Sequence, residues 1–326
     1  MRIAVTGSIA TDHLMVFPGR FADQLLPDRL DHLSVSFLVD RLEVRRGGVA
    51  ANIAFGLGGL GLSPLLVGAA GTDFAEYGVW LKDHGVDTGG VRISERLPTA
   101  RFLCVTDQDA NQIAAFYPGA MTEARDIDLP ALLTGRERFG LVLVSPDDPS
   151  AMLRHTARCR ALGIPFAADP SQQLALLQGG QVEDLVDGAD WLFTNAYEAA
   201  LLTGRTGRSR EEVLASVGAW VTTLGGDGVR IERAGRPPLT VPAVPAEIAD
   251  PTGAGDAFRA GFLAAVSHRV PAESAARLGC ALASLALGAV GPQSHRVDPG
   301  RLSALVEQTY GPGTAAPLAP VLGGPS

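Results

Sequence analysis

The segment Asp250-Pro251-Thr252-Gly253-Ala254-Gly255-Asp256 combines the residue types that anion binding and proton transfer require. Its glycines free consecutive backbone N–H groups to point at one spot, and a helix that begins there adds the positive end of its dipole. Gly253, Ala254 and Gly255 are therefore predicted to hold a phosphoryl group. A carboxylate beside that group would repel it, so Asp256 is better explained as a base that accepts a proton from an attacking hydroxyl. The alternative is a surface acid that stabilises a helix start.

The elements that must position this segment are predicted to form a mostly parallel, doubly wound α/β sheet with helices on both faces. Short apolar runs alternate with helical stretches along the second half of the chain, and this alternation is typical of such a sheet. The predicted strands there are 141–145, 165–168, 191–194 and 220–223, and the predicted helices are 149–162, 182–187, 196–202, 210–218, 254–266 and 273–290. Doubly wound sheets bind ligands at the carboxyl ends of their strands. Polar residues follow the predicted strands at Ser8 and Asp12, at 169–173, at Asn195 and Glu198, and at 225–228.

The first half of the chain predicts strands and helices together with a hairpin, rather than a regular alternation. Residues 3–6 and 65–69 have the pattern of buried strands, and 48–60 and 74–84 that of helices. Residues 101–106 and 112–117 flank a polar turn and predict a hairpin. Residues 311–326 are rich in Gly, Pro and Ala, and a loose tail is expected there.

Composition and missing motifs narrow the function. The net charge is −8 and the 27 basic residues form no stripe, so no nucleic-acid partner is expected. Cys104, Cys159 and Cys280 are widely separated and are expected to be buried, unpaired thiols. There is no signal-peptide pattern and no apolar run approaching the ~20 residues that span a bilayer, so we expect a cytoplasmic protein with no membrane partner. No Gly-x-x-x-x-Gly-Lys-Ser/Thr string occurs, which excludes a P-loop kinase.

Four segments, in the order of the chain, resemble motifs of the ribokinase-like, or PfkB, carbohydrate kinases. They are the Gly-Gly…Asn segment 46–52, the Asn-x-x-Glu segment 195–198, the nucleotide loop 221–228 and the segment 250–256. The resemblance spans roughly residues 1–291. It implies one kinase domain over 1–310 with a small β-sheet lid, whose strands are inserted from about 10–46 and 91–118. The hairpin predicted above fits that lid.

The resemblance also implies roles for single residues. Asp256 would take the proton of the substrate hydroxyl while the N–H groups of Gly253, Ala254 and Gly255 hold the γ-phosphoryl group of ATP. Asn195 and Glu198 would organise Mg²⁺ indirectly. The implied ATP-binding residues are Asn195, Thr223, Gly225, Asp227, Gly228 and Gly253. Asp250 and Thr252 would bind K⁺, although Pro251 stands where ribokinases commonly have Thr.

Aromatic and amide side chains favour a nucleoside as the acceptor. Phe102 and Phe116 lie on the two arms of the predicted hairpin and could enclose a purine. Packing inside the lid, or a dimer contact, is the alternative. Gln172 and Gln173 follow a predicted strand, and their amides could read the polar edges of a base. A simple sugar would need neither feature.

The ribose would be held by residues of the first strand and the Gly-Gly…Asn segment. A carboxylate at Asp12 could accept hydrogen bonds from two adjacent ribose hydroxyls, with Gly48 and Asn52 reaching the same sugar. Taken alone, Asp12 would be interpreted as an acidic turn residue. Its position relative to the other motifs favours the ribose role.

Segments 7–14, 34–40, 116–121 and 169–173 resemble the bacterial, actinobacterial-type adenosine kinases of the same family. The adenosine contacts implied by that resemblance are Ser8, Asp12, Ser36, Gly48, Asn52, Phe102, Phe116 and Gln173. The implied reaction transfers phosphate from ATP to the 5′-hydroxyl of adenosine to give AMP, a purine-salvage step, in a homodimer paired through its lids. A ribokinase- or fructokinase-type sugar kinase is one alternative, and an inactive nucleoside-binding regulator is another.

Overall fold

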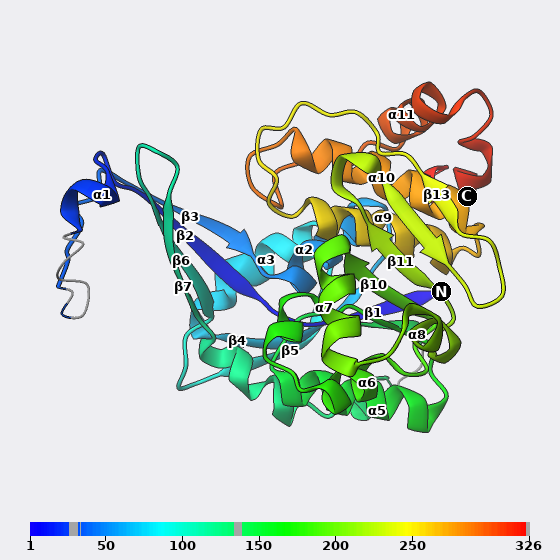
Figure 1. Cartoon of the computed structure of the whole chain (residues 1–326), viewed down its shortest axis with the longest axis horizontal. Coiled ribbons are helices and arrows are strands. Elements are labelled where there is room, and N and C mark those ends of the chain that lie inside the picture. The colour runs from blue at the N-terminus through cyan, green and yellow to red at the C-terminus, as the bar shows by residue number, and fades with distance from the viewer. Residues whose placement is uncertain (26–31, 33, 134–138, 324–326) are drawn as a thin grey trace.

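The computed structural model describes residues 1–25, 32, 34–133 and 139–323, and these form a large and a small sheet (Figure 1). The large sheet has nine strands in the order β13-β12-β11-β10-β9-β8-β1-β4-β5. In chain order these strands are β1 (Arg2–Thr6), β4 (Leu65–Gly71), β5 (Asp87–Ser94), β8 (Phe139–Val144), β9 (Phe166–Ala168), β10 (Trp191–Asn195), β11 (Trp220–Thr223), β12 (Val229–Glu232) and β13 (Leu239–Val241). All pairs from β11 to β5 are parallel, and β12 and β13 add an antiparallel edge.

Helices cover both faces of the large sheet, so the expected doubly wound fold is confirmed. One face packs against α2 (Val49–Gly59), α3 (Ala75–Asp83), α9 (Ala254–Ser267), α10 (Ala272–Leu287) and α11 (Pro299–Tyr310). The other packs against α5 (Pro149–Leu162), α6 (Gly179–Val186), α7 (Ala196–Thr206) and α8 (Arg210–Ser216). Each interface is a separate apolar core, because parallel strands buried on both faces present apolar side chains to both helical layers.

The small sheet projects from one side of the body as an arm (Figure 1). Its order is β3-β2-β6-β7, built from β2 (Ala10–Val16), β3 (Arg41–Gly47), β6 (Ala100–Thr106) and β7 (Gln112–Tyr117). We call this sheet the lid. The predicted hairpin is β6 and β7. The second lid segment begins later than the expected residue 91, because β5 pairs with β4 at the edge of the large sheet. The first expected segment, 10–46, includes residues 26–31 and 33, which lie outside the described part.

Short helices fill the connections between these elements. They are α1 (Phe21–Gln24), η2 (Thr72–Phe74), η3 (Gly119–Asp126), α4 (Leu129–Leu133), η4 (Ser171–Ala175), η5 (Gly225–Asp227), η6 (Ala316–Leu318) and α12 (Ala319–Leu322). The last two differ from the expected loose tail, because Leu318 and Val321 are buried in the core. Residues 324–326 of that expected tail lie outside the described part. Among the described helices, none is long and apolar enough to cross a membrane.

Candidate active site

The predicted anion loop forms the start of α9. Gly253 precedes the helix with φ +80°, and a Cβ on this residue would lie 2.4 Å from the Cβ of Pro292, so a side chain is excluded here. No side chain caps this end of α9. The first backbone N–H groups of a helix have no partner within it. The loop therefore offers N–H groups and a positive dipole end to an anion, as the residue pattern predicts.

Asp256 lies in the first turn of α9, half-buried, and faces α2. Asn52 Nδ2 donates a hydrogen bond of 2.9 Å to Asp256 Oδ2. Burial raises the pKa of Asp256 to about 6, while the Asn52 hydrogen bond and the charge of Arg259 oppose the rise and the charge of Asp12 adds to it. At pH 7 the carboxyl is still largely ionised, and its pKa lies close to the working pH. Both properties suit a general base.

A chain of hydrogen bonds leads away from Asn52 to residues that sequence reasoning did not identify. Gln293 Nε2 donates to Asn52 Oδ1 over 2.9 Å and to the Tyr77 hydroxyl, and Gln293 Oε1 accepts from Trp80 Nε1 over 3.2 Å. Tyr77 in turn donates to the Gly47 carbonyl over 2.9 Å. An indole N–H can only donate, so Trp80 determines which end of the Gln293 amide faces Asn52. Asn52 must then turn Nδ2 toward Asp256.

A buried ion pair supports the other side of α9. Arg259 Nη2 and Nε lie 2.8 Å and 2.6 Å from the two carboxylate oxygens of Asp169, which follows β9. Arg259 Nη1 also donates to the Gly255 carbonyl over 3.1 Å. This pair joins the anion loop to the central sheet. Its signal in the sequence is a single arginine in the otherwise apolar stretch 257–265.

Four side chains form one row across the lid. Asp12 in β2 is the register partner of Arg45 in β3 and of Phe102 in β6, and Phe102 is the partner of Phe116 in β7. Residues directly opposite one another point to the same face of a sheet. Arg45 reaches Asp250 in the body, so this face is the one turned toward the anion loop. Burial raises the pKa of Asp12 to about 6, with Arg45 opposing the rise and Asp250 adding to it.

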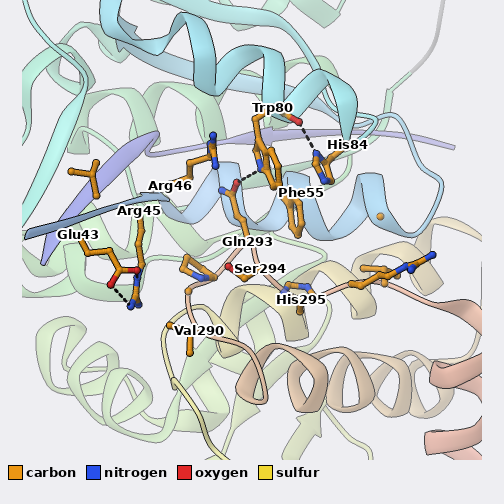
Figure 2. A pocket seen from close by; sticks show the side chains of 16 residues that line it. Glu43, Arg45, Arg46, Phe55, Trp80, His84, Val290, Gln293, Ser294 and His295 are labelled. Atoms are coloured by element: carbon orange, nitrogen blue, oxygen red, sulfur yellow. Dashed lines mark hydrogen bonds and ion pairs between the residues drawn. The ribbon is translucent and has the colours of Figure 1, made fainter.

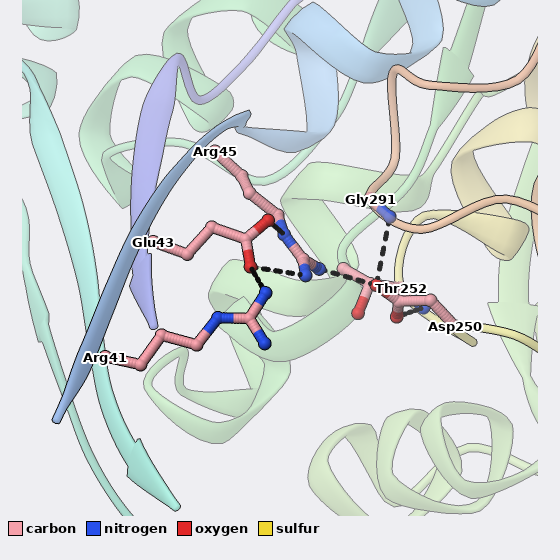
Figure 3. A network of polar contacts seen from close by, with 6 residues as sticks. All are labelled: Arg41, Glu43, Arg45, Asp250, Thr252 and Gly291. Atoms are coloured by element: carbon pink, nitrogen blue, oxygen red, sulfur yellow. Dashed lines mark hydrogen bonds and ion pairs between the residues drawn. The ribbon is translucent and has the colours of Figure 1, made fainter. Parts of the chain in front are cut away.

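Asp250, predicted to bind K⁺, is held by three donors in this structure. Arg45 Nη1 and the Gly291 N–H donate to Oδ2 over 2.8 and 3.0 Å, and the Thr252 N–H donates to Oδ1 over 2.9 Å (Figure 3). Arg45 is itself braced by Glu43, which also pairs with Arg41. The positive charge of Arg45 therefore disfavours a monovalent cation at the Asp250 carboxylate, and Thr252 contributes both its backbone N–H and its hydroxyl to that carboxylate.

Several residues predicted to bind ATP line one cavity of about 590 Å³. Thr223, Gly225 and Gly228 meet Ala254 and Gly255 there, and apolar residues of α9, α10 and 243–248 complete the wall. Asn195, Asp227 and Gly253, also predicted to bind ATP, do not line this cavity. It joins the anion loop, so a nucleotide held in it would place its phosphates at the start of α9.

Asn195 and Glu198, predicted to act on Mg²⁺, cap α7 reciprocally. Glu198 N–H donates to Asn195 Oδ1 over 2.8 Å, and Asn195 N–H donates to Glu198 Oε2 over 2.7 Å. The other oxygen of Glu198 accepts from the Ser171 hydroxyl over 3.2 Å. A carboxylate with both oxygens bonded keeps further lone pairs, so it fits a contact to metal-bound water. No cluster of three or more His, Cys, Asp or Glu among the described residues could hold a metal alone.

The remaining predicted substrate residues divide into two groups. Ser8 is buried, and its hydroxyl accepts the Val49 N–H over 3.0 Å at the start of α2. Gly48 beside it adopts φ +94°, where a Cβ would lie 2.6 Å from the backbone of residues 8–10. These two shape the Asn52 side of the site. Ser36 is exposed, and its neighbour Phe37 packs on Phe21 of α1 at the outer end of the lid, so the structure does not bring Ser36 to the other residues.

The two predicted glutamines differ in burial. Gln172 is exposed, and the hydroxyl of Ser171 is its neighbour at 3.4 Å. Gln173 is only 7% exposed, and its Oε1 has no hydrogen-bond partner among the described residues. A buried, unpaired amide oxygen carries a free-energy penalty unless something else supplies a donor. Oε1 of Gln173 is therefore an unpaired acceptor near the carboxyl end of β9.

The assembled site has the parts that transfer of an anionic group to a hydroxyl requires. Backbone N–H groups and a helix dipole can stabilise the moving charge, a carboxylate with a raised pKa can accept the proton, and a nucleotide-sized cavity opens onto both. The lid carries a carboxylate and two aromatic rings on the face turned to this site. Such a lid can hold the acceptor and exclude water.

Comparison with known proteins agrees with this arrangement. The model of the pfkB family of carbohydrate kinases matches residues 9–298. The nucleoside kinase of Methanothermobacter thermautotrophicus is 32% identical over 84% of this chain and 88% of its own length. The structure of Burkholderia thailandensis nucleoside kinase in complex with inosine is 32% identical, with TM-score 0.83 over 94% of this chain and 98% of that one.

A nucleoside kinase structure from Methanocaldococcus jannaschii has TM-score 0.83 and 26% identity, and covers 94% of this chain and 98% of its own. These relatives are nucleoside kinases in general, so they do not single out the actinobacterial adenosine kinases to which the sequence segments pointed. The match over most of the chain shows the family itself: this protein belongs to the pfkB family of carbohydrate kinases.

Proposed function

We propose that this protein is an ATP-dependent nucleoside kinase that transfers the γ-phosphoryl group of ATP to the 5′-hydroxyl of adenosine, giving AMP for purine salvage. The observation that carries the proposal is the row Arg45, Asp12, Phe102 and Phe116 on one face of the lid. It offers a carboxylate for ribose hydroxyls next to two rings for a base. Simple sugars have no use for the rings.

In this mechanism each part of the site has one task. Asp256 accepts the proton of the 5′-hydroxyl, and the N–H groups at the start of α9 stabilise the charge on the phosphoryl group. Asn52 holds Asp256 in position through its 2.9 Å hydrogen bond. Asn195 and Glu198 would hold Mg²⁺ indirectly, and the ion would neutralise phosphate charge on ATP. No step requires K⁺ at Asp250.

The relatives support a purine as the base. Burkholderia thailandensis nucleoside kinase has been solved with inosine and with ADP-inosine, the latter at 33% identity and TM-score 0.81 to this chain. Adenosine differs from inosine in carrying a 6-amino donor. The unpaired, buried Oε1 of Gln173 is an acceptor of the kind that such a donor needs. Inosine also has a donor at N1–H, so Gln173 favours a purine of either kind, and the choice of adenosine rests on the segments that resemble adenosine kinases.

A substrate panel tests the proposal. Purified protein with Mg-ATP is offered adenosine, inosine, guanosine, cytidine, ribose and fructose, and the phosphorylated products are separated and quantified. We expect adenosine to have the highest kcat/KM. Turnover of ribose or fructose without turnover of nucleosides would make it a sugar kinase. Binding of adenosine with no AMP formed under any of these conditions would make it a regulator.

The lid row has a matched control within one strand. Phe116 and Tyr117 are adjacent, 46% and 42% exposed, and point to opposite faces. Base stacking on an aromatic ring contributes about 1–3 kcal/mol, so Phe116→Ala should raise the KM for adenosine by about tenfold or more with little change in kcat. Tyr117→Ala should leave that KM within about twofold. Equal effects of the two variants would remove the base-stacking role.

We also propose that the lid pairs two copies of the chain. The face opposite the row exposes Leu42, Val44, Ile113 and Tyr117, between 42% and 60% accessible. Contiguous exposed apolar side chains on a small sheet favour association. Light scattering on the wild type should give a dimer mass. Val44→Glu places a charge on that face and should give the monomer mass, and a wild-type monomer would refute the pairing.

A further inference from the structure

A second cavity lies at the other end of the hydrogen-bond chain that begins at Asp256. It has a volume of about 460 Å³ and is enclosed by the base of β3, by α2 and α3, and by residues 290–297 (Figure 2). None of the residues predicted to bind adenosine, ATP or metal lines it. Gln293, Trp80 and the lid residue Arg45 do line it, so the cavity adjoins the active site and is bonded to it.

The charge around this cavity is positive in a protein whose net charge is −8. Arg46 and Arg296 line it and are exposed, and neither makes an ion pair with a described residue. The guanidinium of Arg46 lies 4.5 Å from the ring centre of Trp80. The one acidic lining residue, Glu43, is already paired with arginines. Two arginine forks are thus held at the cavity without an internal counter-charge.

Two histidines lie beside the cavity. His84 Nδ1 bonds to the Trp80 carbonyl at 2.7 Å, so the ring is fixed and Nε2 is left for another partner. His295 is only 6% exposed and stands edge-on to Phe55 at 5.5 Å, and both of its ring nitrogens are buried, so they offer no donor to a ligand in the cavity. Burial lowers the pKa of His295 to about 4, with the Pro292 carbonyl offsetting part of the shift, so the ring is neutral at pH 7.

Guanidinium groups that line a cavity without a counter-charge favour an anionic ligand. The donors available here are two guanidinium forks and the His84 ring, which is more than one carboxylate can satisfy. A phosphate group accepts several hydrogen bonds and pairs with arginine forks in bidentate geometry. The side chains therefore match a phosphate group better than a carboxylate.

We propose that this cavity is a second ligand site that binds a phosphate-bearing anion through Arg46, Arg296 and His84. Occupation reaches the active site through Gln293, whose amide lines the cavity and holds Asn52 against Asp256. The site regulates the reaction rather than taking part in it. Coupling of this kind is reciprocal, so nucleoside in the active site changes the affinity of the cavity for phosphate. This assignment goes beyond the proposed function, and its binding test needs no catalysis.

The fluorescence of Trp80, which lines the cavity, should report directly on phosphate binding there. The full-length protein is titrated with inorganic phosphate against chloride at constant ionic strength, and tryptophan fluorescence is recorded. We expect a saturable change that Trp80→Phe abolishes. The double substitution Arg46→Ser with Arg296→Ser removes both forks, and it should weaken the apparent Kd by at least about tenfold. Both arginines are exposed, so the variant is expected to fold, which thermal melting checks.

Arg233 provides the matched control, because its guanidinium also lies over a tryptophan, 5.2 Å from the ring centre of Trp191. Arg233→Ser should leave the titration unchanged. An unchanged Kd in the Arg46, Arg296 double variant would mean that phosphate acts from the anion loop, and it would overturn the proposal. So would the lack of any saturable change with both inorganic phosphate and AMP.

The two sources of the phosphate group are separated by the same titration. If inorganic phosphate and AMP both bind with a Kd that depends on Arg46 and Arg296, the cavity recognises the phosphate alone. If only AMP binds in this way, the ligand is a nucleotide and the apolar wall of Phe55 and Trp80 contributes to binding. Either result supports a phosphate-bearing ligand and identifies its class.

Discussion

Gln293 donates a hydrogen bond of 2.9 Å to Asn52 Oδ1, and the direction of this bond decides which atom of Asn52 faces Asp256. Trp80 anchors the other end of the Gln293 amide by donating to its oxygen over 3.2 Å. The three side chains come from α2, α3 and the segment after α10. Together they keep the Asn52 Nδ2 donor bonded to the Asp256 carboxylate, which is proposed as the base.

Gln293→Glu tests this device. One carboxylate oxygen can still accept from Trp80, but the other replaces the donor to Asn52 with an acceptor. Asn52 should then turn Nδ2 to the glutamate and its oxygen to Asp256. In the wild type, the hydrogen bond from Asn52 lowers the pKa of Asp256. Loss of this bond should raise that pKa, so the acidic limb of the kcat/KM profile should move up by as much as about one pH unit.

The shape of the pH profile separates positioning from damage to the fold. In the Gln293→Glu variant we expect kcat/KM to recover toward the wild-type plateau at high pH. Trp80→Phe removes the indole N–H together with part of the ring but leaves the Gln293 amide intact, so it should shift the limb in the same direction by less. A uniform loss at every pH, with the limb unmoved, would show that Gln293 does not act through Asp256.

Asp256 itself makes a sharper prediction. Burial raises the pKa of both Asp256 and Asp12 to about 6, so wild-type kcat/KM should fall as pH drops through that region, with an apparent pKa that belongs to the pair. Asp256→Asn should lower kcat by about 10²–10⁴-fold, the usual contribution of a general base. Calorimetry should show nearly unchanged nucleoside binding. A kcat within about tenfold of wild type would assign the proton transfer elsewhere.

The sequence predicts the parts of this site that depend on local pattern. Gly253 and Asp256 could be placed because glycines before a helix and an acid in its first turn are adjacent in the chain. Phe102 and Phe116 could be paired because a short turn determines the hairpin register. The predicted sheet and its helices follow from alternating apolar runs, whose burial on both faces requires two helical layers.

Contacts between distant residues could not be predicted in the same way. Gln293 and Asn52 are 241 positions apart, and no local pattern in the sequence marks Gln293 as the hydrogen-bond partner of Asn52. The Arg45 contact to Asp250 likewise joins the lid to a loop 205 positions away, and it changes what Asp250 can bind. The resemblance places the start of the second lid segment near residue 91, within β5, but β5 pairs with β4 in the large sheet, and that pairing depends on tertiary contacts.

The buried pair Arg259 and Asp169 predicts a stability effect. Arg259→Met keeps the volume but leaves Asp169 buried without its counter-charge, which should lower the free energy of unfolding by about 3–5 kcal/mol. Adding Asp169→Leu removes the stranded carboxylate, so the double variant should regain much of the loss. Urea denaturation measures all three proteins. A double variant no more stable than the single one would mean that the ion pair is not the source of the effect.

The ion pair between Arg45 and Asp250 joins the lid to the anion loop, and we expect activity to depend on it. Both side chains are largely buried, 19% and 14% exposed, and their atoms are 2.8 Å apart. Arg45→Met should lower kcat/KM by about tenfold or more, since hydrogen bonds to charged groups contribute about 1.5–3 kcal/mol. Arg41 lies on the same face of β3 and pairs with Glu43 without reaching Asp250. Arg41→Met should change kcat/KM by less than about twofold.

The response of kcat/KM to K⁺ shows whether Arg45 acts by joining the lid to the body or by supplying positive charge beside the anion loop. With Arg45 in place the Asp250 carboxylate has three donors, so a cation has little access to it. Removing the guanidinium frees Oδ2 and leaves uncompensated negative charge beside the phosphate site. Exchange of Na⁺ for K⁺ at constant ionic strength should therefore activate Arg45→Met more than the wild type. If the wild type responds to K⁺ as strongly as the variant, the cation binds elsewhere, and Arg45 only joins the lid to the body.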